Sequence, residues 1–241
     1  MPMRLENVRE DQLYRILLGI NVVFFALCIL IDPFHVNWSM NPFQLLTPSD
    51  RVLVMMGATG TLPIDRMHRW WSLLSANYLH GSLLHLLFNM AALRQLAALI
   101  FDGYGPSRMI AIYTVSGIAG FAVSYIAGVT LTIGASASLC GLMGAGMLLG
   151  QQIGGDGGRL LFRQIGSWAL GVFVFGLLIP GINNWGHGGG LACGYLLAWV
   201  LEHRRRKQES AADRALAWVC IAATALILLY AAVSTLFYRL G

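Results

Sequence analysis

Long runs of apolar residues, separated mostly by short polar connections, constrain this chain more than any other feature of its sequence. A helix needs about 20 mainly apolar residues to cross a bilayer. Candidate spans occur in seven places, of which the fourth and sixth are short and begin in small or polar residues: 13–31, 81–100, 109–129, 133–150, 160–179, 185–201 and 215–236. The sequence therefore predicts an all-α, polytopic membrane helical bundle.

The composition of the 241-residue chain agrees with lipid as its solvent. Charged residues make up 11% and hydrophobic residues 57%, whereas a soluble domain carries roughly a quarter charged residues. The 28 glycines point the same way, because glycine lets membrane helices approach closely. The cysteines fall inside apolar runs without metal-ligand spacing, so small buried side chains are expected rather than disulfides or a metal site: Cys28, Cys140, Cys193 and Cys220.

The polar segments divide the chain into four parts. We expect a cytoplasmic N-terminal segment at 1–12, a core of six spans at 13–203, a basic linker at 204–214 and a seventh span at 215–241. The first apolar run is too long for a signal-peptide core, so it should stay in the membrane. The long connection at 32–71 looks interfacial and should hold a short helix capped by Thr47, with Pro48 in its first turn.

The distribution of Lys and Arg predicts the orientation of the bundle. If the N-terminus is cytoplasmic, that side receives eleven of these residues and the other side four, as the positive-inside rule requires. The run "EHRRRKQES" is then a cytoplasmic stop before the last span, and nucleic-acid binding is a poor second interpretation. Because no organellar presequence is visible and the loops are compact, we expect a bacterial cytoplasmic (inner) membrane.

Three polar clusters lie near the starts of the second, fourth and sixth spans. They read "HGSLLHLLFN", "GASAS" and "WGHGGG". In the predicted orientation all three spans start on the extracytoplasmic side, so the clusters lie at one depth, a little below the outer surface. Ionisable residues inside a membrane are costly and usually mark function. The coincidence of depth therefore predicts a functional site that opens to the extracytoplasmic side.

The helical period places small residues beside the polar ones. His187 shares its face with Gly190 and Gly194, three and seven residues on. The fourth span carries a matching stripe of small residues beside Ser136: Ala137, Gly141 and Gly144. Such faces let membrane helices pack tightly, so Ser136 and His187 should come within hydrogen-bond reach of each other.

These residue types suggest acyl-transfer chemistry. A serine hydroxyl is a weak nucleophile until a base such as histidine accepts its proton. His85 and Asn89 share a face of the second span and could donate to an oxyanion, as could the free N–H groups that begin the fourth span. No Asp or Glu lies at this depth to orient the base. A Ser136–His187 dyad is therefore expected rather than a triad.

The three clusters together resemble the motifs of the rhomboid intramembrane proteases. "HGSLLHLLFN" is similar to their His-x4-His-x3-Asn motif, "GASAS" to Gly-x-Ser-x, and "HGGGLACG" to His-x2-Gly-x3-Gly. The motifs occur in the right order, and six of the seven spans match the six-helix core of that family. The resemblance implies a six-helix rhomboid-like core plus one C-terminal transmembrane helix.

The resemblance also implies a function and a set of roles. It implies a serine endopeptidase that cleaves in or near the transmembrane segments of single-pass membrane proteins, without a metal or other cofactor. The resemblance does not specify the oligomeric state of the chain. By position, Ser136 is the nucleophile, His187 the base, and Asn89, His85 and the Ser136 N–H the oxyanion site. The supporting residues are His80, Gly134, Gly190 and Gly194.

Several positions depart from the family pattern. Ala137 follows the serine where glycine is common, and Cys140 stands where an aromatic residue often packs on the histidine. The Trp-Arg pair of the first loop appears as Trp71-Ser72, so its arginine contacts are missing or supplied by Arg69. None of these changes removes a catalytic group.

Three alternatives remain beside this interpretation. Ser138, about 200° round the helix from Ser136, is expected to pack rather than react. A catalytically inactive rhomboid-like protein that binds membrane-protein clients would normally have lost the serine or the histidine, and both are present. A channel or transporter should show internal repeats and charges at mid-depth, which we do not find. The fifth span and "IPGINN" are the candidates for a lateral gate.

Overall fold

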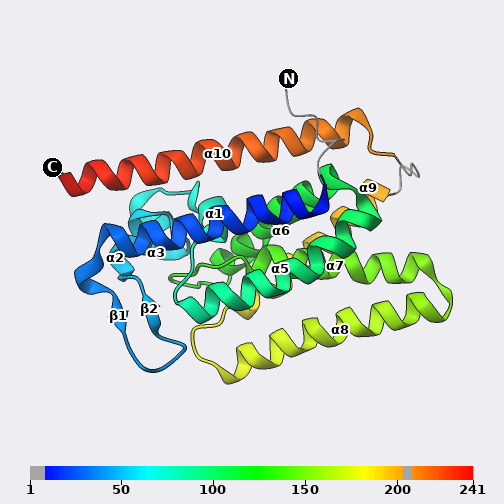
Figure 1. The fold of residues 1–241 in the computed structure, drawn as a ribbon, viewed down its shortest axis with the longest axis horizontal. Helices are drawn as coiled ribbons and strands as arrows, with labels where there is room; N and C mark the ends of the chain where they lie inside the picture. The colour runs from blue at the N-terminus through cyan, green and yellow to red at the C-terminus, as the bar shows by residue number, and fades with distance from the viewer. Residues whose placement is uncertain (1–8, 203–207, 241) are drawn as a thin grey trace.

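A computed structural model of the chain describes residues 9–202 and 208–240. Helices dominate it and confirm the all-α bundle (Figure 1). The long helices correspond one to one with the seven predicted spans: α1 (Glu10–Ile31), α5 (Leu83–Tyr104), α6 (Pro106–Ile126), α7 (Ser136–Ile153), α8 (Gly155–Leu178), α9 (Asn184–Glu202) and α10 (Ala211–Leu240). The basic run at 203–207 lies outside the described residues.

The long helices differ in how they meet the membrane. Within the described residues, five are long and apolar enough to cross it, namely α1, α5, α6, α8 and α10. The two short predicted spans became α7, of 18 residues, and α9, of 19 residues. These two pack more closely against each other than any other pair of elements, and α6 flanks α9. Both short helices are therefore packed against other helices of the bundle.

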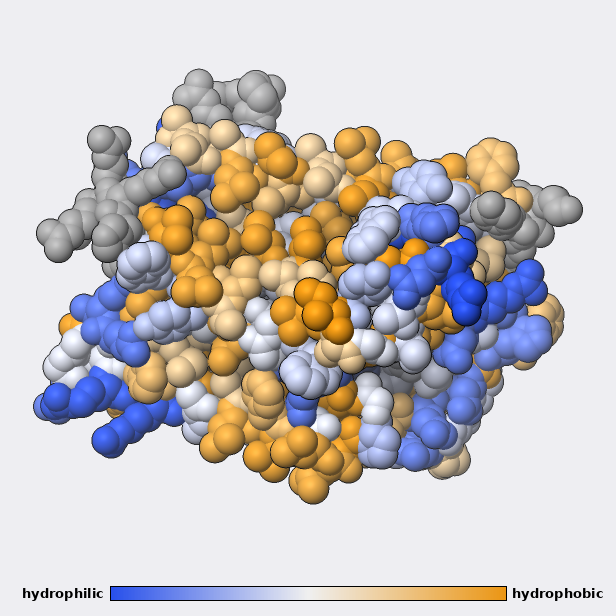
Figure 2. Space-filling view, turned by 180° about the vertical axis from the view of Figure 1, so that it is seen from behind, coloured by the Kyte–Doolittle hydropathy of each residue, from blue (hydrophilic) through white to orange (hydrophobic). Residues whose placement is uncertain are grey.

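The surface agrees with insertion in a bilayer. Figure 2 shows the back of the molecule, where hydrophobic side chains form a broad band across the middle. Hydrophilic side chains gather towards the two ends of the long axis. Because the long helices run roughly along this axis (Figure 1), the apolar band covers their middle sections on this face. This is the distribution that a hydrocarbon layer with water on both sides selects.

The connection between α1 and α5 is the largest irregular part of the fold. It holds an antiparallel pair of strands, β1 (Asn37–Trp38) and β2 (Leu45–Thr47), in which Asn37 pairs with Thr47 and Trp38 with Leu45. Three short helices follow: α2 (Asp50–Met55), α3 (Thr61–Met67) and α4 (Ser72–Ser75). A 3-10 turn, η2 (Pro33–His35), precedes the strands, and a second one, η3 (Ala76–Tyr78), leads towards α5.

The predicted cap of the short helix was wrong by two residues. Ser49, not Thr47, caps α2, because the Ser49 hydroxyl accepts the Val52 N–H at 3.4 Å. Thr47 instead belongs to β2, and its hydroxyl donates to the Gln44 carbonyl. Pairing with β1 keeps Thr47 extended, so the helix starts beyond Pro48.

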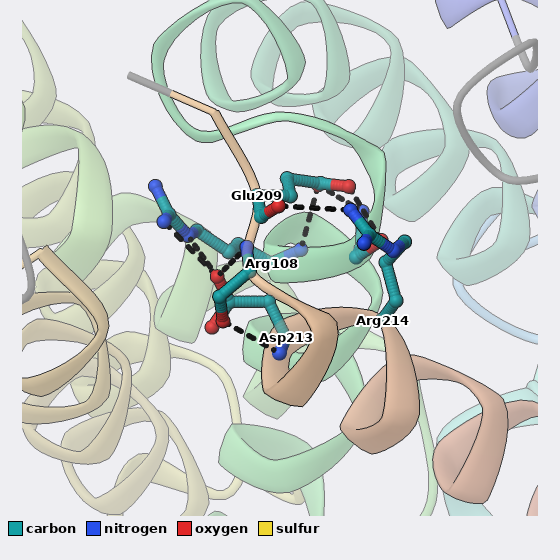
Figure 3. A network of polar contacts seen from close by, with 6 residues as sticks. Arg108, Glu209, Asp213 and Arg214 are labelled. Atoms are coloured by element: carbon teal, nitrogen blue, oxygen red, sulfur yellow. Dashed lines mark hydrogen bonds and ion pairs between the residues drawn. The ribbon is translucent and has the colours of Figure 1, made fainter. Parts of the chain in front are cut away.

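The last helix, α10, begins four residues before the predicted span. Its start is fixed by a reciprocal cap, in which the Asp213 N–H donates to the Ser210 hydroxyl and the Ser210 N–H to the Asp213 carboxylate. Figure 3 shows the same carboxylate beside Arg108 of α6, with Nη2 and Oδ2 3.0 Å apart and both side chains buried. Glu209 accepts the Ser107 N–H at 2.6 Å. These contacts attach α10 to the first turn of α6.

Candidate active site

Ser136 is the first residue of α7 and follows a tight turn. Gly134 in that turn has φ +122°, a conformation that residues with a side chain rarely adopt. Its N–H donates to the Ala76 carbonyl at 2.9 Å. A Cβ at Gly134 would lie 2.7 Å from Nε2 of His85 and 3.8 Å from Oγ of Ser136. The bare glycine therefore lets the His85 imidazole lie beside the half-buried serine.

The structure brings Ser136 and His187 together. Oγ of Ser136 lies 2.9 Å from Nε2 of His187, which is in the first turn of α9 and only 4% exposed. The approach depends on two glycines of α9. A Cβ at Gly190 would overlap the carbonyl oxygen of Ala137, and one at Gly194 that of Gly141. The close packing expected from the small-residue stripes is thus present in the fold.

The second ring nitrogen of His187 faces Asn184. Nδ1 of His187 and Oδ1 of Asn184 are 3.3 Å apart, and Nδ2 of Asn184 donates to the Phe173 carbonyl of α8 at 3.1 Å. Because the amide NH₂ is directed to that carbonyl, the amide oxygen is the atom that faces the imidazole. A neutral His187 then carries its proton on Nδ1, and Nε2 is free to accept the serine proton.

Asn184 and Phe173 were missed by sequence reasoning. The Phe173 ring lies edge-on to His187, with centroids 6.5 Å apart, and Cys140 at the expected aromatic position is buried in α7. Asn184 lies three residues before the histidine on one helix face, which is a detectable spacing. A Cβ at Gly176 of α8 would overlap the Asn184 amide, so this glycine makes room for it.

His85 and Asn89 lie on α5, on the other side of the serine. Nδ1 of His85 accepts the Gly81 N–H at 3.3 Å, so a neutral His85 carries its proton on Nε2, the nitrogen beside Gly134. Asn89 is buried, and its Nδ2 donates one hydrogen to the His85 carbonyl at 3.0 Å. The second Nδ2 hydrogen is not needed for that bond. Each of the two side chains thus keeps an N–H that could donate a hydrogen bond to a developing oxyanion.

His80 lies in the segment between η3 and α5 and is fully buried. Its ring is 5.0 Å from that of His85 in an edge-on arrangement. Neither ring nitrogen has a hydrogen-bond partner among the described residues. Burial, reinforced by the neighbouring His85, lowers the pKa of His80 well below its usual range, so this ring is neutral at physiological pH.

Polar contacts tie the segments around the starts of α7 and α9 to the site. Nδ2 of Asn183 donates to the hydroxyls of Ser124 and Thr132, which joins the start of α9 to α6 and to the segment before Ser136. Thr132 also pairs through its backbone with Thr59 of the long connection. Arg69 donates to the Val54 carbonyl at 2.7 Å. Its guanidinium also lies 5.8 Å from the centre of the Trp71 ring, so Arg69 supplies loop contacts that Ser72 cannot.

Ser138 is placed apart from the imidazole. It is fully buried, and its hydroxyl donates to Oδ1 of Asn77 at 2.9 Å. Within the described part of the chain no group of three or more His, Cys, Asp or Glu residues is arranged to hold a metal ion. The four cysteines are free thiols. Among the predicted site residues, the geometry gathers Ser136, His187, His85 and Gly134 around one point.

The class of protein follows from the fold and the site together. In a helical membrane bundle, a serine of α7 lies within hydrogen-bond distance of a histidine of α9. Residues 67–204 match the family model described as Rhomboid domain. The chain therefore belongs to the rhomboid family, and it is an integral membrane protein.

Curated relatives agree with this assignment. RHOMBOID-like protein 4 of Arabidopsis thaliana is 35% identical over 168 residues, which cover 68% of this chain and 42% of the relative. Rhomboid protease GluP of Bacillus subtilis (strain 168) is 31% identical over 136 residues, 55% of this chain and 26% of the relative. Inactive RHOMBOID-like protein 8 of Arabidopsis thaliana is 32% identical over 109 residues, 44% of this chain and 31% of the relative. The chain thus spans less than half of each of these proteins.

Proposed function

We propose that this chain is an intramembrane serine endopeptidase that hydrolyses peptide bonds in or near the transmembrane segments of other membrane proteins. The observation that carries the proposal is the 2.9 Å contact between Oγ of Ser136 and Nε2 of His187. The Asn184 contact supports it, because it leaves Nε2 as the basic nitrogen. A serine held only for packing does not need an oriented base.

The first half of the reaction forms an acyl-enzyme. His187 Nε2 accepts the hydroxyl proton while Ser136 Oγ bonds to the carbonyl carbon of the substrate. The negative charge that develops on the carbonyl oxygen is stabilised by the N–H of Ser136, which has no intrahelical partner at the start of α7, and by His85 and Asn89. The carbon–nitrogen bond then breaks, and the leaving amine takes the proton from His187 Nε2.

The second half returns the enzyme to its starting state. A water molecule gives a proton to His187 Nε2 as its oxygen attacks the acyl carbon. The ester bond to Ser136 Oγ breaks, and Oγ recovers the proton from His187. The half-buried position of Ser136 at the extracytoplasmic starts of α7 and α9 is compatible with access of water from that side.

The substrate must present an extended peptide to this site. A transmembrane helix has its carbonyls occupied by its own hydrogen bonds, so it has to unwind locally before Ser136 can attack. Residues that weaken a helix near its extracytoplasmic end should therefore favour cleavage. We also propose a cytoplasmic N-terminus and a bacterial inner membrane, on the Lys and Arg distribution described above.

A reporter with one cleavable transmembrane segment tests the function. Co-expressed with the full chain, it should be cleaved by the wild type and, more slowly, by Ser138→Ala, whereas Ser136→Ala and His187→Ala should lower cleavage by about 1,000-fold or more. A fluorophosphonate should label the wild type and Ser138→Ala but not Ser136→Ala. For orientation, an impermeant maleimide should label Ser39→Cys in intact cells and Asp156→Cys only after lysis.

The outcomes separate protease from binding protein. Cleavage that survives Ser136→Ala would contradict the assignment of the nucleophile. If the wild type does not cleave, and the reporter co-purifies equally with wild type and Ser136→Ala, the chain is an inactive client-binding member of the family.

A further inference from the structure

Ser136 lies between two hydrogen bonds that end on neighbouring residues of η3. Two positions before the serine, the Gly134 N–H donates to the Ala76 carbonyl at 2.9 Å. Two positions after it, the Ser138 hydroxyl donates to Oδ1 of Asn77, also at 2.9 Å. One short segment therefore holds the nucleophile's turn on both sides. We call this pair of contacts the Ala76–Asn77 clamp.

The Asn77 side chain is oriented by its own segment. Its Nδ2 donates to the carbonyls of Leu73 and Leu74, at 3.0 and 3.2 Å. With its NH₂ group used in this way, the amide must turn its oxygen towards Ser138. Asn77 is 3% exposed and Ser138 is fully buried, so without each other these two polar groups would have no water to bond to.

The neighbouring helix α6 leaves space for the clamp. A Cβ at Gly117 would overlap both Oγ of Ser138 and Oδ1 of Asn77. Any residue other than glycine at this position would therefore separate the two partners or displace α7. The space that Gly117 leaves is occupied by the two hydrogen-bonded atoms, Oγ of Ser138 and Oδ1 of Asn77. A serine that served only to fill space in α7 would not account for this arrangement.

The segment that carries the clamp is supported from behind by α10. The ring of Trp71 packs edge-on against that of Tyr230 of α10, with centroids 5.3 Å apart, and α4 also contacts α10. On another side, the Ser75 hydroxyl donates to the Gly57 carbonyl at 2.8 Å. The segment is thus held in place by contacts that do not involve α7.

We propose that Asn77 is a positioning residue for the nucleophile: through Ser138 it holds the start of α7 so that Ser136 stays within reach of His187. The inference rests on the proposed function. Displacement of a nucleophile by a fraction of an ångström is enough to slow acyl transfer. Asn77 itself touches neither the substrate nor the reacting atoms.

The variants Asn77→Ala, Ser138→Ala and their double form a mutant cycle in the full chain. Each single change should lower kcat for the reporter peptide about 10-fold and leave KM unchanged, because the nucleophile moves while substrate binding does not. The double variant should be no slower than either single one, since the two side chains act through one bond. The rate of Ser136 labelling by a fluorophosphonate should fall in parallel.

Ser116→Ala is the matched control for a merely structural effect. Ser116 is a buried serine of α6 whose hydroxyl donates within its own helix, to the Ile112 carbonyl. Its loss should lower the unfolding temperature in detergent while the labelling rate of Ser136 stays at the wild-type value. Labelling of Asn77→Ala at the wild-type rate, or single effects that multiply in the double variant, would overturn the clamp. If the wild type neither cleaves nor labels, the proposed function fails and the clamp fails with it.

Discussion

At the scale of single residues, the position of one proton decides whether His187 can act as a base. Asn184 fixes that position, since its amide accepts from Nδ1 of His187 and donates to the Phe173 carbonyl. In serine hydrolases with a catalytic triad this role is filled by a carboxylate, whereas here the amide oxygen of Asn184 faces Nδ1. A neutral amide held by a backbone carbonyl of α8 can orient the ring without a second charge in an apolar site.

Replacing Asn184 should therefore slow the reaction without removing Ser136 or His187 from the site. We expect Asn184→Ala to lower kcat about 5-fold, because one hydrogen bond is worth about 1 kcal/mol. Asn184→Asp keeps an acceptor for Nδ1 and should recover activity to within about threefold of the wild type. Steady-state cleavage of the reporter measures both. Equal rates for Asn184→Ala and wild type would show that another group orients His187.

The sequence predicted the parts of the site that follow from residue spacing along a single helix. Ser136, His187 and the glycines facing them follow from spacing along two helices. Asn77 and Ser138 are 61 positions apart, and nothing in either local pattern indicates that they meet. Their contact depends on where η3 sits against α7, which tertiary packing alone determines.

At the scale of helices, the site depends on how closely α7 and α9 approach. The path of α9 past α7 is set by glycines whose absent side chains leave room for carbonyl oxygens of the other helix. Backbone atoms cannot move aside for an added Cβ as the end of a flexible side chain can. A single methyl group at this crossing would separate the helices that carry Ser136 and His187.

Gly194→Ala should accordingly be far more damaging than a glycine substitution elsewhere in a long helix. A Cβ there would overlap backbone atoms of Gly141, whereas a Cβ at Gly171 of α8 meets nothing within 4 Å. We expect Gly194→Ala to abolish cleavage and lower the unfolding temperature. Gly171→Ala should leave both unchanged or slightly raise stability. Similar unfolding temperatures for the two variants would contradict the close approach of α7 and α9.

Helix positions were easier to predict than helix ends. The positions of all seven long helices were predicted from their apolar runs, because a bilayer demands long apolar helices. The starts of α2 and α10 were not, since each is set by a hydroxyl that accepts a backbone N–H, Ser49 for one and Ser210 for the other. Several hydroxyl residues lie near each end, and the structure alone shows which of them is the cap.

At the scale of the whole molecule, α10 joins the two ends of the bundle. The residues matched by the family model end at 204, so α10 lies beyond the shared core. Yet α10 contacts α6 and also reaches α2 and α4 in the connection between α1 and α5, and Figure 1 shows it running the full length of one side. One of its ends is fixed by Arg108 and Asp213, the other by packing on the segment that carries the Ala76–Asn77 clamp.

The buried Arg108–Asp213 pair should therefore be a major determinant of stability. Asp213→Asn keeps a side chain that can cap Ser210 but removes the buried carboxylate that pairs with the Arg108 guanidinium, which is 5% exposed; breaking such a pair should cost about 3–5 kcal/mol. Chemical denaturation in detergent measures the loss. Asp156→Asn breaks the exposed pair with Arg159 and should change nothing. If Asp213→Asn unfolds like the wild type, α10 is not held by this pair. If it loosens α10, cleavage by the folded fraction should also slow, because the segment beside Ser136 loses its support.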